Sequence, residues 1–494
     1  MRDLLKEPLW REEDLGKNLP DSPHATSVAL PLWRHVVGYE ENDPAVLSAL
    51  SCGYPRFVAH PYVRQLFEHA RQEFACSGEQ AFVFPTETVA QRCARYVREK
   101  TGLVARVQAT GVNGLHAVVF PDAAFEPVKK YWQHFGEIVS SRAALAAIEG
   151  RRPTDGTAKG MLRERIASLA GGRAEDVFLY PSGMAALAAG LRAAQAHRSG
   201  GKSAQLGFPY VDLLKIQSVT GPGVHFLADP SDANVDAIAG LVERETLSAV
   251  FCEVPGNPLL QCVDLPRLSE LLRKHGVPLI VDDTPGTFAN IDVLPWADMV
   301  VSSLTKSFSG VGDVMAGSVV LNPESALYNA LAPLVREQFE DLFWEEDAAA
   351  LEENSRDFPE RMQVVNKNAE ALTDYLAGHP AVERVYYPKQ ETRARYERVM
   401  RPGGGYSCLL SLLLKDAPRR SAPFYDALRV CKGPSLGLNF TISCPYVLLA
   451  HYNELDWVEQ CGLSRFLLRI SVGMEPADEM IGRFEEAFQL VGKV

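Results

Sequence analysis

The sequence predicts an α/β protein with a mostly parallel sheet in a large central domain, a smaller C-terminal α/β domain and an N-terminal extension. Three observations support this prediction. Between residues 177 and 321, short apolar runs alternate with helical patterns. The runs are apolar throughout, which is typical of strands covered on both faces. The helical patterns between them are the crossover connections that parallel strands need.

The central region holds seven predicted strands and at least three predicted helices. The strands are Val177–Tyr180, Ala204–Phe208, His225–Ala228, Ala249–Val254, Pro278–Val281, Met299–Val301 and Ala316–Leu321. The helices cover residues 182–198, 233–244 and 265–275. We expect this region, residues 126–350, to be the domain that carries a ligand at its strand ends.

The two flanking regions have different patterns. After residue 350, a long helix (358–378), three strands (384–387, 407–413 and 466–471) and a terminal helix (477–491) predict the small domain, residues 351–494. Residues 1–125 mix helical patterns (61–75 and 86–100) with strand-like runs (103–107 and 115–120). They form the predicted N-terminal extension.

Composition excludes several classes of protein. The 494 residues include 50 basic and 62 acidic side chains, a net charge of −12, which disfavours binding to nucleic acid or to an anionic membrane. Nine cysteines contain no C-x-x-C pair, so neither a zinc site nor any other metal site is predicted. The N-terminus lacks the apolar core of a signal peptide, and no run of 18 apolar residues exists. We therefore expect a cytoplasmic enzyme.

The first candidate site follows the strand Val177–Tyr180. Ser182 and Gly183 open a helix, where free N–H groups can bind a phosphate. Met184 follows in the same turn. By itself, the segment is more typical of an ordinary serine N-cap before an alanine-rich helix.

Two further candidates also follow strands. Asp282 ends the strand Pro278–Val281, at the edge where open α/β sheets bind ligands. Lys306 follows Met299–Val301 and is flanked by Ser303 and Thr305. A lysine becomes a nucleophile when burial or nearby cations lower its pKa. The alternatives are a loop carboxylate and a solvated lysine.

The last candidates are a turn and a buried arginine. Asn257 lies in the turn Glu253–Pro258, which by itself is more typical of a plain Pro/Gly/Asn turn than of a site. Arg469 lies inside an apolar strand, where it needs an anion; a substrate carboxylate or an internal ion pair would both serve.

The order of these elements along the chain is more specific than any one of them. This order resembles that of the pyridoxal-phosphate (PLP) enzymes of the cystathionine γ-synthase/γ-lyase family, of fold type I. It runs from a phosphate-binding turn through an aromatic residue, an asparagine turn, a strand-end aspartate and a hydroxyl-flanked lysine to a late arginine. The resemblance covers residues 160–494. The N-terminal part, with Gly53–Phe57, resembles the extended fungal cystathionine γ-synthase-like proteins. The segments that carry it are Glu253–Pro258, Asp282–Thr284, Ser303–Ser307, Gly312–Gly317, Ser435–Gly437 and Leu468–Gly473.

The resemblance implies a role for each residue. Lys306 would bind PLP covalently and then move protons, and Asp282 would face the pyridine nitrogen. Tyr210 would stack on the ring and serve as an acid toward the leaving group, although an ordinary core tyrosine is the alternative. Asn257 would bind the phenolic oxygen. Arg469, helped by Ser435, would hold the substrate carboxylate. The phosphate would be held by Ser182, Gly183, Met184, Ser303 and Thr305.

Some segments depart from the family pattern. The family supplies a Tyr-x-Arg motif to the phosphate from a neighbouring subunit, and our candidate arginine is Arg142. The resemblance therefore implies a homodimer or homotetramer with shared active sites. The loop Leu438–Thr441 lacks the family's glycine and acid, and Val211-Asp212 replaces the glycines after Tyr210. Since the loop lies near the substrate side chain in the family, the nucleophile stays open.

The leading hypothesis is therefore γ-replacement on an activated homoserine such as O-acyl-L-homoserine. The second substrate would be a sulfur nucleophile or a carbon nucleophile such as a β-keto acid. A PLP-dependent β- or γ-lyase is the nearest alternative, and a non-catalytic PLP-fold binding protein is the alternative of another class. A nicotinamide-dependent dehydrogenase is disfavoured because no G-x-G-x-x-G follows a predicted strand.

Overall fold

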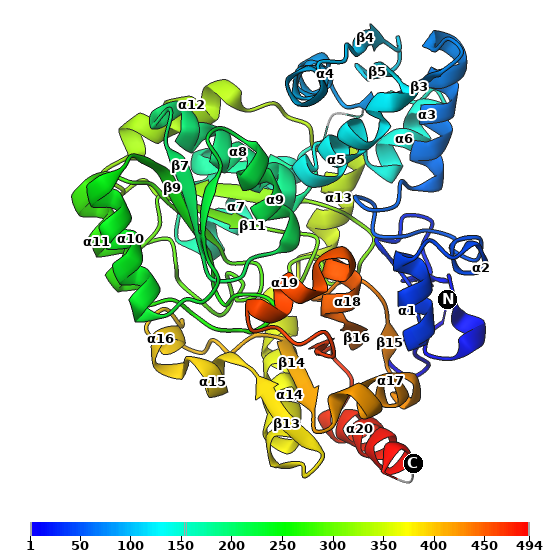
Figure 1. Ribbon diagram of the computed structural model, residues 1–494, viewed down its shortest axis with the longest axis vertical. Coiled ribbons are helices and arrows are strands. Elements are labelled where there is room, and N and C mark those ends of the chain that lie inside the picture. The colour runs from blue at the N-terminus through cyan, green and yellow to red at the C-terminus, as the bar shows by residue number, and fades with distance from the viewer. Residues whose placement is uncertain (1, 153, 155, 493–494) are drawn as a thin grey trace.

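The computed structural model describes residues 2–152, 154 and 156–492. Figure 1 shows a large sheet with helices around it, a smaller sheet near the C-terminus, and a third unit of helices and short strands formed by the N-terminal part of the chain. The sheets have seven, five and three strands, and a two-stranded ribbon pairs β1 with β2. Within the described residues, every helix is too short or too polar to cross a bilayer.

The large sheet has the order β6-β12-β11-β10-β9-β7-β8. Only β12 runs antiparallel to its two neighbours, so the predicted mostly parallel sheet is confirmed. All residues of five strands are buried, as the continuous apolar runs predict. In β7 only the first residue, Lys202, is half-buried, whereas the edge strand β8 is half-buried throughout. The strands are β6 (Val177–Tyr180), β7 (Lys202–Leu206), β8 (Val224–Leu227), β9 (Leu247–Glu253), β10 (Leu279–Asp282), β11 (Met299–Ser302) and β12 (Gly317–Leu321).

Helices cover both faces of this sheet. Along β6, Phe178 and Tyr180 pack into one apolar core, while Val177 and Leu179 pack into the other. The first core is completed by α5 (Phe125–Phe135), α8 (Gly183–His197), α9 (Val211–Val219) and α12 (Tyr328–Gln338). The second core is completed by α7 (Ala158–Ala170), α10 (Asp232–Arg244), α11 (Leu265–His275) and α13 (Glu345–Asn354).

The smaller sheet has the order β13-β14-β17-β16-β15. Its core also buries Ala25, Val28, Leu30 and Val36, so the beginning of the chain packs onto the C-terminal domain. Strands and helices here are β13 (Val382–Tyr386), β14 (Leu409–Leu414), β15 (Cys431–Lys432), β16 (Ile442–Pro445), β17 (Leu468–Ser471), α14 (Phe358–Gly378), α15 (Pro388–Glu391), α16 (Arg393–Glu397), α17 (Ala417–Ala427), α18 (Tyr446–His451), α19 (Leu455–Gln460) and α20 (Ala477–Val491).

The third unit pairs β3, β5 and β4 in an antiparallel sheet. The sequence predicts the helices 61–75 and 86–100 correctly but misses β3, whose first two residues are only half-buried. The elements before α7 are β1 (Asn18–Leu19), β2 (Ser27–Val28), α1 (Trp33–Glu40), α2 (Pro44–Leu47), α3 (Pro61–Phe74), β3 (Glu79–Phe84), α4 (Glu87–Thr101), β4 (Arg106–Ala109), β5 (His116–Pro121) and α6 (Ser141–Ile148).

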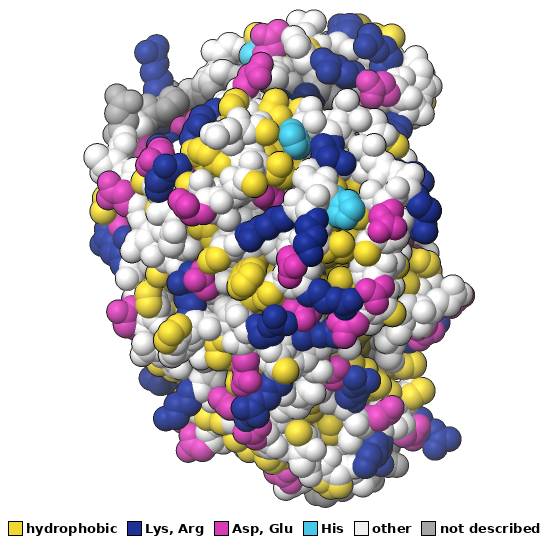
Figure 2. All heavy atoms as spheres, turned by 90° about the vertical axis from the view of Figure 1, so that its left-hand side faces the viewer, with side chains coloured by type: hydrophobic (Ala, Val, Ile, Leu, Met, Phe, Trp, Pro, Cys, Tyr) yellow, Lys and Arg dark blue, Asp and Glu magenta, His cyan; other side chains and the backbone are white. Residues whose placement is uncertain are grey.

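On the face seen in Figure 2, lysine and arginine side chains are interspersed with aspartate and glutamate. That face has no extended area of one sign of charge, in agreement with the mixed composition.

Candidate active site

A cavity of about 450 Å³ lies where the large domain, the small domain and the N-terminal segment meet. It is reached by the carboxyl ends of β9 and β10 through Glu253 and Asp282. Most of the residues that the sequence singles out line this cavity, as expected for the switch region of an α/β sheet. They are Gly183, Met184, Tyr210, Asn257, Asp282, Ser303, Lys306, Ser435 and Arg469.

Lys306 is enclosed by polar and aromatic groups. Its Nζ lies 3.2 Å from the hydroxyl of Tyr54, 3.4 Å from Oγ of Ser435 and 4.4 Å from the centre of the Tyr54 ring. Burial lowers the pKa of Lys306 below its usual range. The amine is therefore more readily available as a free base than that of a surface lysine.

The helix α8 begins at the cavity wall. Ser182 caps it, since its Oγ accepts from the N–H of Ala185 at 3.1 Å and donates to the carbonyl of Gly136 at 2.8 Å. The N–H groups of Gly183 and Met184 have no hydrogen-bond partner among the described residues. A side chain at position 183 would lie 2.7 Å from Cβ of Ser303, so only glycine permits this approach. The helix end is thus an open anion site.

Two of the predicted phosphate ligands lie outside the cavity lining. Ser182 uses its hydroxyl as the helix cap. Thr305 donates to the carbonyl of Ala316 at 3.1 Å and accepts from its N–H at 3.0 Å. In this structure, both hydroxyls brace the turns on either side of the cavity. Of the predicted phosphate ligands, Gly183, Met184 and Ser303 line the cavity.

Asp282 lies at the end of β10 and is almost fully buried. Its Oδ1 accepts from the N–H of Thr284 at 2.9 Å, and burial raises the pKa of Asp282 to about 6. A buried carboxylate of this kind gains most from a cationic ring nitrogen beside it, because the charge pair offsets the cost of desolvation.

Arg469 projects from β17 toward the same cavity. Its guanidinium donates to Oδ1 of Asn257 at 3.2 Å and to the carbonyl of Ser435 at 2.8 Å, and lies 4.5 Å from the ring of Tyr446. Within the described part of the chain, no carboxylate forms an ion pair with it. Ser435 holds a positive φ of 120°, an uncommon conformation that recurs at ligand sites. The arginine is thus positioned to receive an external carboxylate.

The structure adds two residues that the sequence reasoning missed, Tyr54 and Arg56. Arg56 donates to the hydroxyl of Tyr210 at 2.6 Å, to Oδ2 of Asp212 at 2.5 Å and to the carbonyl of Gln133 at 2.7 Å. The signal was available, because Tyr54-Pro55-Arg56 is itself a Tyr-x-Arg sequence. Here the motif enters the cavity of its own chain.

Asp212 holds this arginine in place. The side chains of Arg56 and Asp212 are 2% and 1% exposed, and Nδ1 of His134 lies 2.8 Å from the other carboxylate oxygen. Burial by itself would raise the pKa of Asp212. The charge of Arg56 and the hydrogen bonds from Arg56 and His134 have the larger effect, so the pKa of Asp212 lies below its usual value. The replacement of a family glycine by Asp212 therefore supplies an anchor for the cation.

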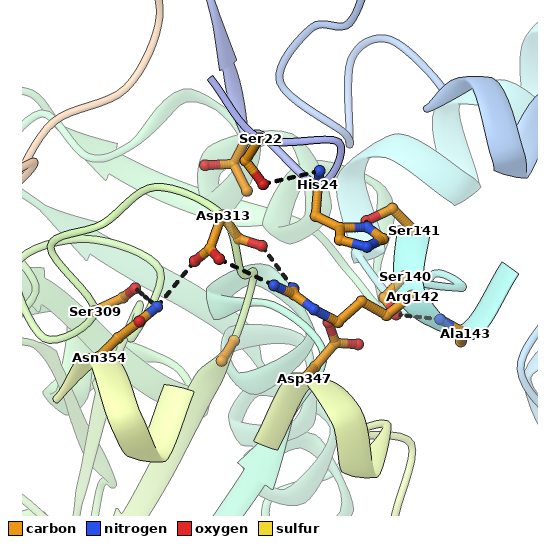
Figure 3. Close-up of polar contacts among 12 residues, drawn as sticks. Ser22, His24, Ser140, Ser141, Arg142, Ala143, Ser309, Asp313, Asp347 and Asn354 are labelled. Carbon is orange, nitrogen blue, oxygen red and sulfur yellow. Dashed lines mark hydrogen bonds and ion pairs between the residues drawn. The ribbon is translucent and has the colours of Figure 1, made fainter. Parts of the chain in front are cut away.

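Arg142, our candidate for the phosphate arginine, is not among the residues lining this cavity. It donates to the carbonyl of Asp313 at 2.6 Å and pairs with the carboxylates of Asp313 and Asp347 at 3.0 and 3.1 Å (Figure 3). Asn354 donates to the other oxygen of Asp313 at 2.9 Å. Within one chain, Arg142 binds the loop that follows Lys306, whereas the arginines that line the cavity are Arg56 and Arg469.

These residues fit PLP. The helix N-terminus and Arg56 would hold its phosphate, Asp282 would pair with its pyridine nitrogen, Asn257 would donate to its phenolic oxygen, and Lys306 would bind its aldehyde. Among the described residues, no cluster of histidine, cysteine or acidic side chains could hold a metal ion.

Comparison with known proteins agrees with this fit. Residues 151–489 match the family described as Cys/Met metabolism PLP-dependent enzyme. The chain belongs to this family. It is therefore a PLP-dependent enzyme, and the family and cofactor predicted from the motif order are confirmed. Residues 62–140 match a second family, the N-terminal domain of fungal trans-sulfuration enzymes.

Individual relatives cover nearly the whole chain. A cystathionine gamma-synthase of Neurospora crassa is 36% identical, over 97% of this chain and 98% of its own. The cystathionine gamma-synthase-like enzyme iboG2 of Amanita muscaria is 34% identical over 95% of each. Among solved structures, cystathionine gamma synthase from Xanthomonas oryzae pv. oryzae in complex with aminoacrylate and cysteine has a TM-score of 0.58 and 25% identity, over 69% of this chain and 87% of that one. The predicted fold is confirmed.

Proposed function

We propose that this enzyme catalyses γ-replacement on an activated homoserine, such as O-acyl-L-homoserine, with a sulfur nucleophile. One observation carries the proposal: the amine of Lys306, whose pKa is lowered, and the guanidinium of Arg469 share one cavity of about 450 Å³. Among the described residues, no carboxylate forms an ion pair with Arg469. That volume lies in the range of small-molecule sites. Relatives named cystathionine gamma-synthase support this reaction class.

PLP supplies an electron sink that stabilises negative charge at Cα and Cβ of a bound amino acid. The protein supplies orientation and proton transfer. Arg469 and Ser435 fix the substrate carboxylate, which directs Cα toward Lys306. The free base of Lys306 removes and returns protons on that side. The Tyr54 ring lies against the amine, 4.4 Å from Nζ, and its hydroxyl accepts a hydrogen bond from it.

Tyr210 is assigned the proton for the leaving group. Burial holds the pKa of Tyr210 well above its usual range, so its hydroxyl stays protonated. The guanidinium of Arg56, 2.6 Å away, would stabilise the phenolate that remains after transfer. Tyr210 and Arg56 together would therefore assist the departure of the acyloxy leaving group from Cγ.

The structure bears on the choice of nucleophile. The loop Leu438–Thr441 lacks the family's acid, which is why a carbon nucleophile stays an alternative. However, Leu438 and Phe440 pack into a core with Leu9, and Asn439 accepts from Arg361 at 3.0 Å. None of the four loop residues lines the cavity. The unusual loop is therefore no argument for a carbon acid, and a sulfur nucleophile is favoured.

Product analysis tests the proposal. Holoenzyme is incubated with O-acetyl-L-homoserine, with and without L-cysteine or a β-keto acid. We expect cystathionine that depends on cysteine. Equal accumulation of 2-oxobutyrate with and without a nucleophile would instead identify a lyase. No turnover by fully PLP-loaded protein would support the non-catalytic alternative.

A further inference from the structure

The beginning of the chain lies beside β15 of the small domain (Figure 1). The N–H of Leu30 donates to the carbonyl of Lys432 in that strand at 2.8 Å. A side chain at position 433 would overlap the carbonyl oxygen of Val28, so only glycine permits this close approach. The N-terminal segment is therefore fixed relative to the chain that leads from β15 to the active-site cavity.

Ser27, in β2, reaches the turn that follows β15. Its side chain is fully buried, and its Oγ donates to the carbonyl of Pro434. Among the described residues, no other group donates to that carbonyl. Pro434 and Ser435 line the cavity, whereas Ser27 lies behind them, outside the lining. Any effect of Ser27 on a bound substrate must therefore pass through this turn.

The backbone of Ser435 has a conformation that its surroundings must maintain. Its φ of 120° is uncommon for a residue with a side chain, and such a residue keeps it only where neighbouring groups hold it. The peptide plane before Ser435 carries the Pro434 carbonyl, which Ser27 binds. The plane after it carries the Ser435 carbonyl, which accepts from Arg469 at 2.8 Å. Because the rotations at Cα of Ser435 relate these two rigid planes, holding the first plane fixes where the second carbonyl points.

Ser27 is itself held from other directions. Its carbonyl accepts from Sγ of Cys52 at 3.1 Å. The preceding residue, Thr26, donates to the carbonyl of Gly312 through its N–H at 2.8 Å and its Oγ1 at 2.9 Å. Gly312 belongs to the loop that follows Lys306. The position of Ser27 thus does not depend on the turn that it binds.

We propose that Ser27 is a positioning residue for the substrate carboxylate, because it holds the Pro434–Ser435 turn whose carbonyl orients Arg469. The proposal rests on the carboxylate-binding role proposed for Arg469 and adds a residue of the N-terminal segment to it. Arg469 uses donors on Asn257 and Ser435, which leaves the other donors of its fork for a carboxylate. If the Ser435 carbonyl moves, the planar guanidinium loses this orientation and matches a carboxylate less well.

Two small amines test the proposal with holoenzyme. Glycine carries a carboxylate and methylamine does not, and each should change the absorbance of bound PLP when it displaces the amine of Lys306. The Kd of each amine is measured from this change at one fixed pH. The ratio of the methylamine Kd to the glycine Kd isolates the contribution of the carboxylate to binding, without any turnover.

The variants change the hydroxyl at position 27 and a matched hydroxyl elsewhere. Ser27→Ala should lower the ratio about tenfold, by raising the Kd of glycine while that of methylamine stays unchanged. Ser27→Thr keeps a hydroxyl and should retain most of the wild-type ratio. Ser51→Ala is the matched control and should leave the ratio unchanged, since Oγ of the exposed Ser51 donates to the carbonyl of Gly16, elsewhere in the N-terminal segment.

An unchanged ratio in Ser27→Ala would overturn the proposal. Equal losses in Ser27→Ala and Ser27→Thr would also overturn it, because packing and not the hydroxyl would then decide the effect. Arg469→Ala distinguishes this failure from that of the proposed function. If Arg469→Ala lowers the ratio and Ser27→Ala does not, only the role of Ser27 fails. If Arg469→Ala keeps the wild-type ratio, the carboxylate role of Arg469 fails as well. The absorbance of bound PLP checks that each variant is folded and loaded.

Discussion

Replacing Arg56 by methionine removes a buried cation from the centre of the active site. The side chain contacts Asp212 at 2.5 Å and the Tyr210 hydroxyl at 2.6 Å, and is 2% exposed. Removing one partner of a buried ion pair costs about 3–5 kcal/mol, because the other charge stays buried without compensation. We therefore expect the apoenzyme to lose about that much unfolding free energy, measured by urea denaturation.

The same substitution should weaken PLP binding. A charge-assisted hydrogen bond is worth about 1.5–3 kcal/mol, so the Kd for PLP should rise roughly 10- to 150-fold. Absorbance titration of the apoenzyme measures this constant. Arg64→Met is the matched control, since Arg64 is exposed on α3 and its side chain has no hydrogen-bond partner among the described residues.

Asp212→Asn separates the two functions of Arg56. It removes the anchor but keeps the cation, so stability should fall while the Kd for PLP changes much less than in Arg56→Met. If Arg56→Met binds PLP as tightly as wild type, Arg56 is not a phosphate ligand and the reasoning from this cavity is wrong.

Four other predictions follow from the contacts. Lys306→Ala should abolish turnover and the borohydride-sensitive yellow chromophore, measured by absorbance. Arg469→Ala should weaken binding of the amino-acid substrate by about 2–5 kcal/mol, seen as a raised KM; an unchanged KM would remove Arg469 from the site. Because Tyr54 and Arg56 enter their own chain's cavity, mixed oligomers of Arg56→Met and Lys306→Ala chains should show no activity beyond the sum of the separate variants. Regained activity would show that the motif crosses between subunits. Burial lowers the pKa of Lys432 to about 7, so the folded state disfavours the charged lysine and Lys432→Met should raise the unfolding free energy at pH 7. This gain should shrink toward pH 10, because the lysine of the unfolded chain then also loses its proton. A difference in unfolding free energy that does not change with pH would contradict this.

Much of the large domain was predictable because its signals are local. The strands β6 and β11, the helix α8 and the terminal helix α20 lie within about two residues of their predicted bounds. Buried parallel strands need continuous apolar runs, and a helix start needs a cap such as Ser182. The antiparallel direction of β12 has no such signal, because a fully buried strand has the same composition in either direction.

The sequence by itself determined the cofactor chemistry, because the order of motifs from Ser182 to Arg469 resembles that of the PLP family. It also placed Asp282 and Lys306 after strands whose carboxyl ends converge on one edge of the large sheet. Arg469 lies inside a strand of the smaller sheet, so only the packing of the two domains brings it to the same cavity. Only the tertiary structure decided which N-terminal residues complete the site. Tyr54 reaches Lys306 across 252 positions, and Arg56 finds Asp212 across 156. Such contacts depend on how separately folded segments pack, and no local pattern of hydrophobicity or spacing records that packing.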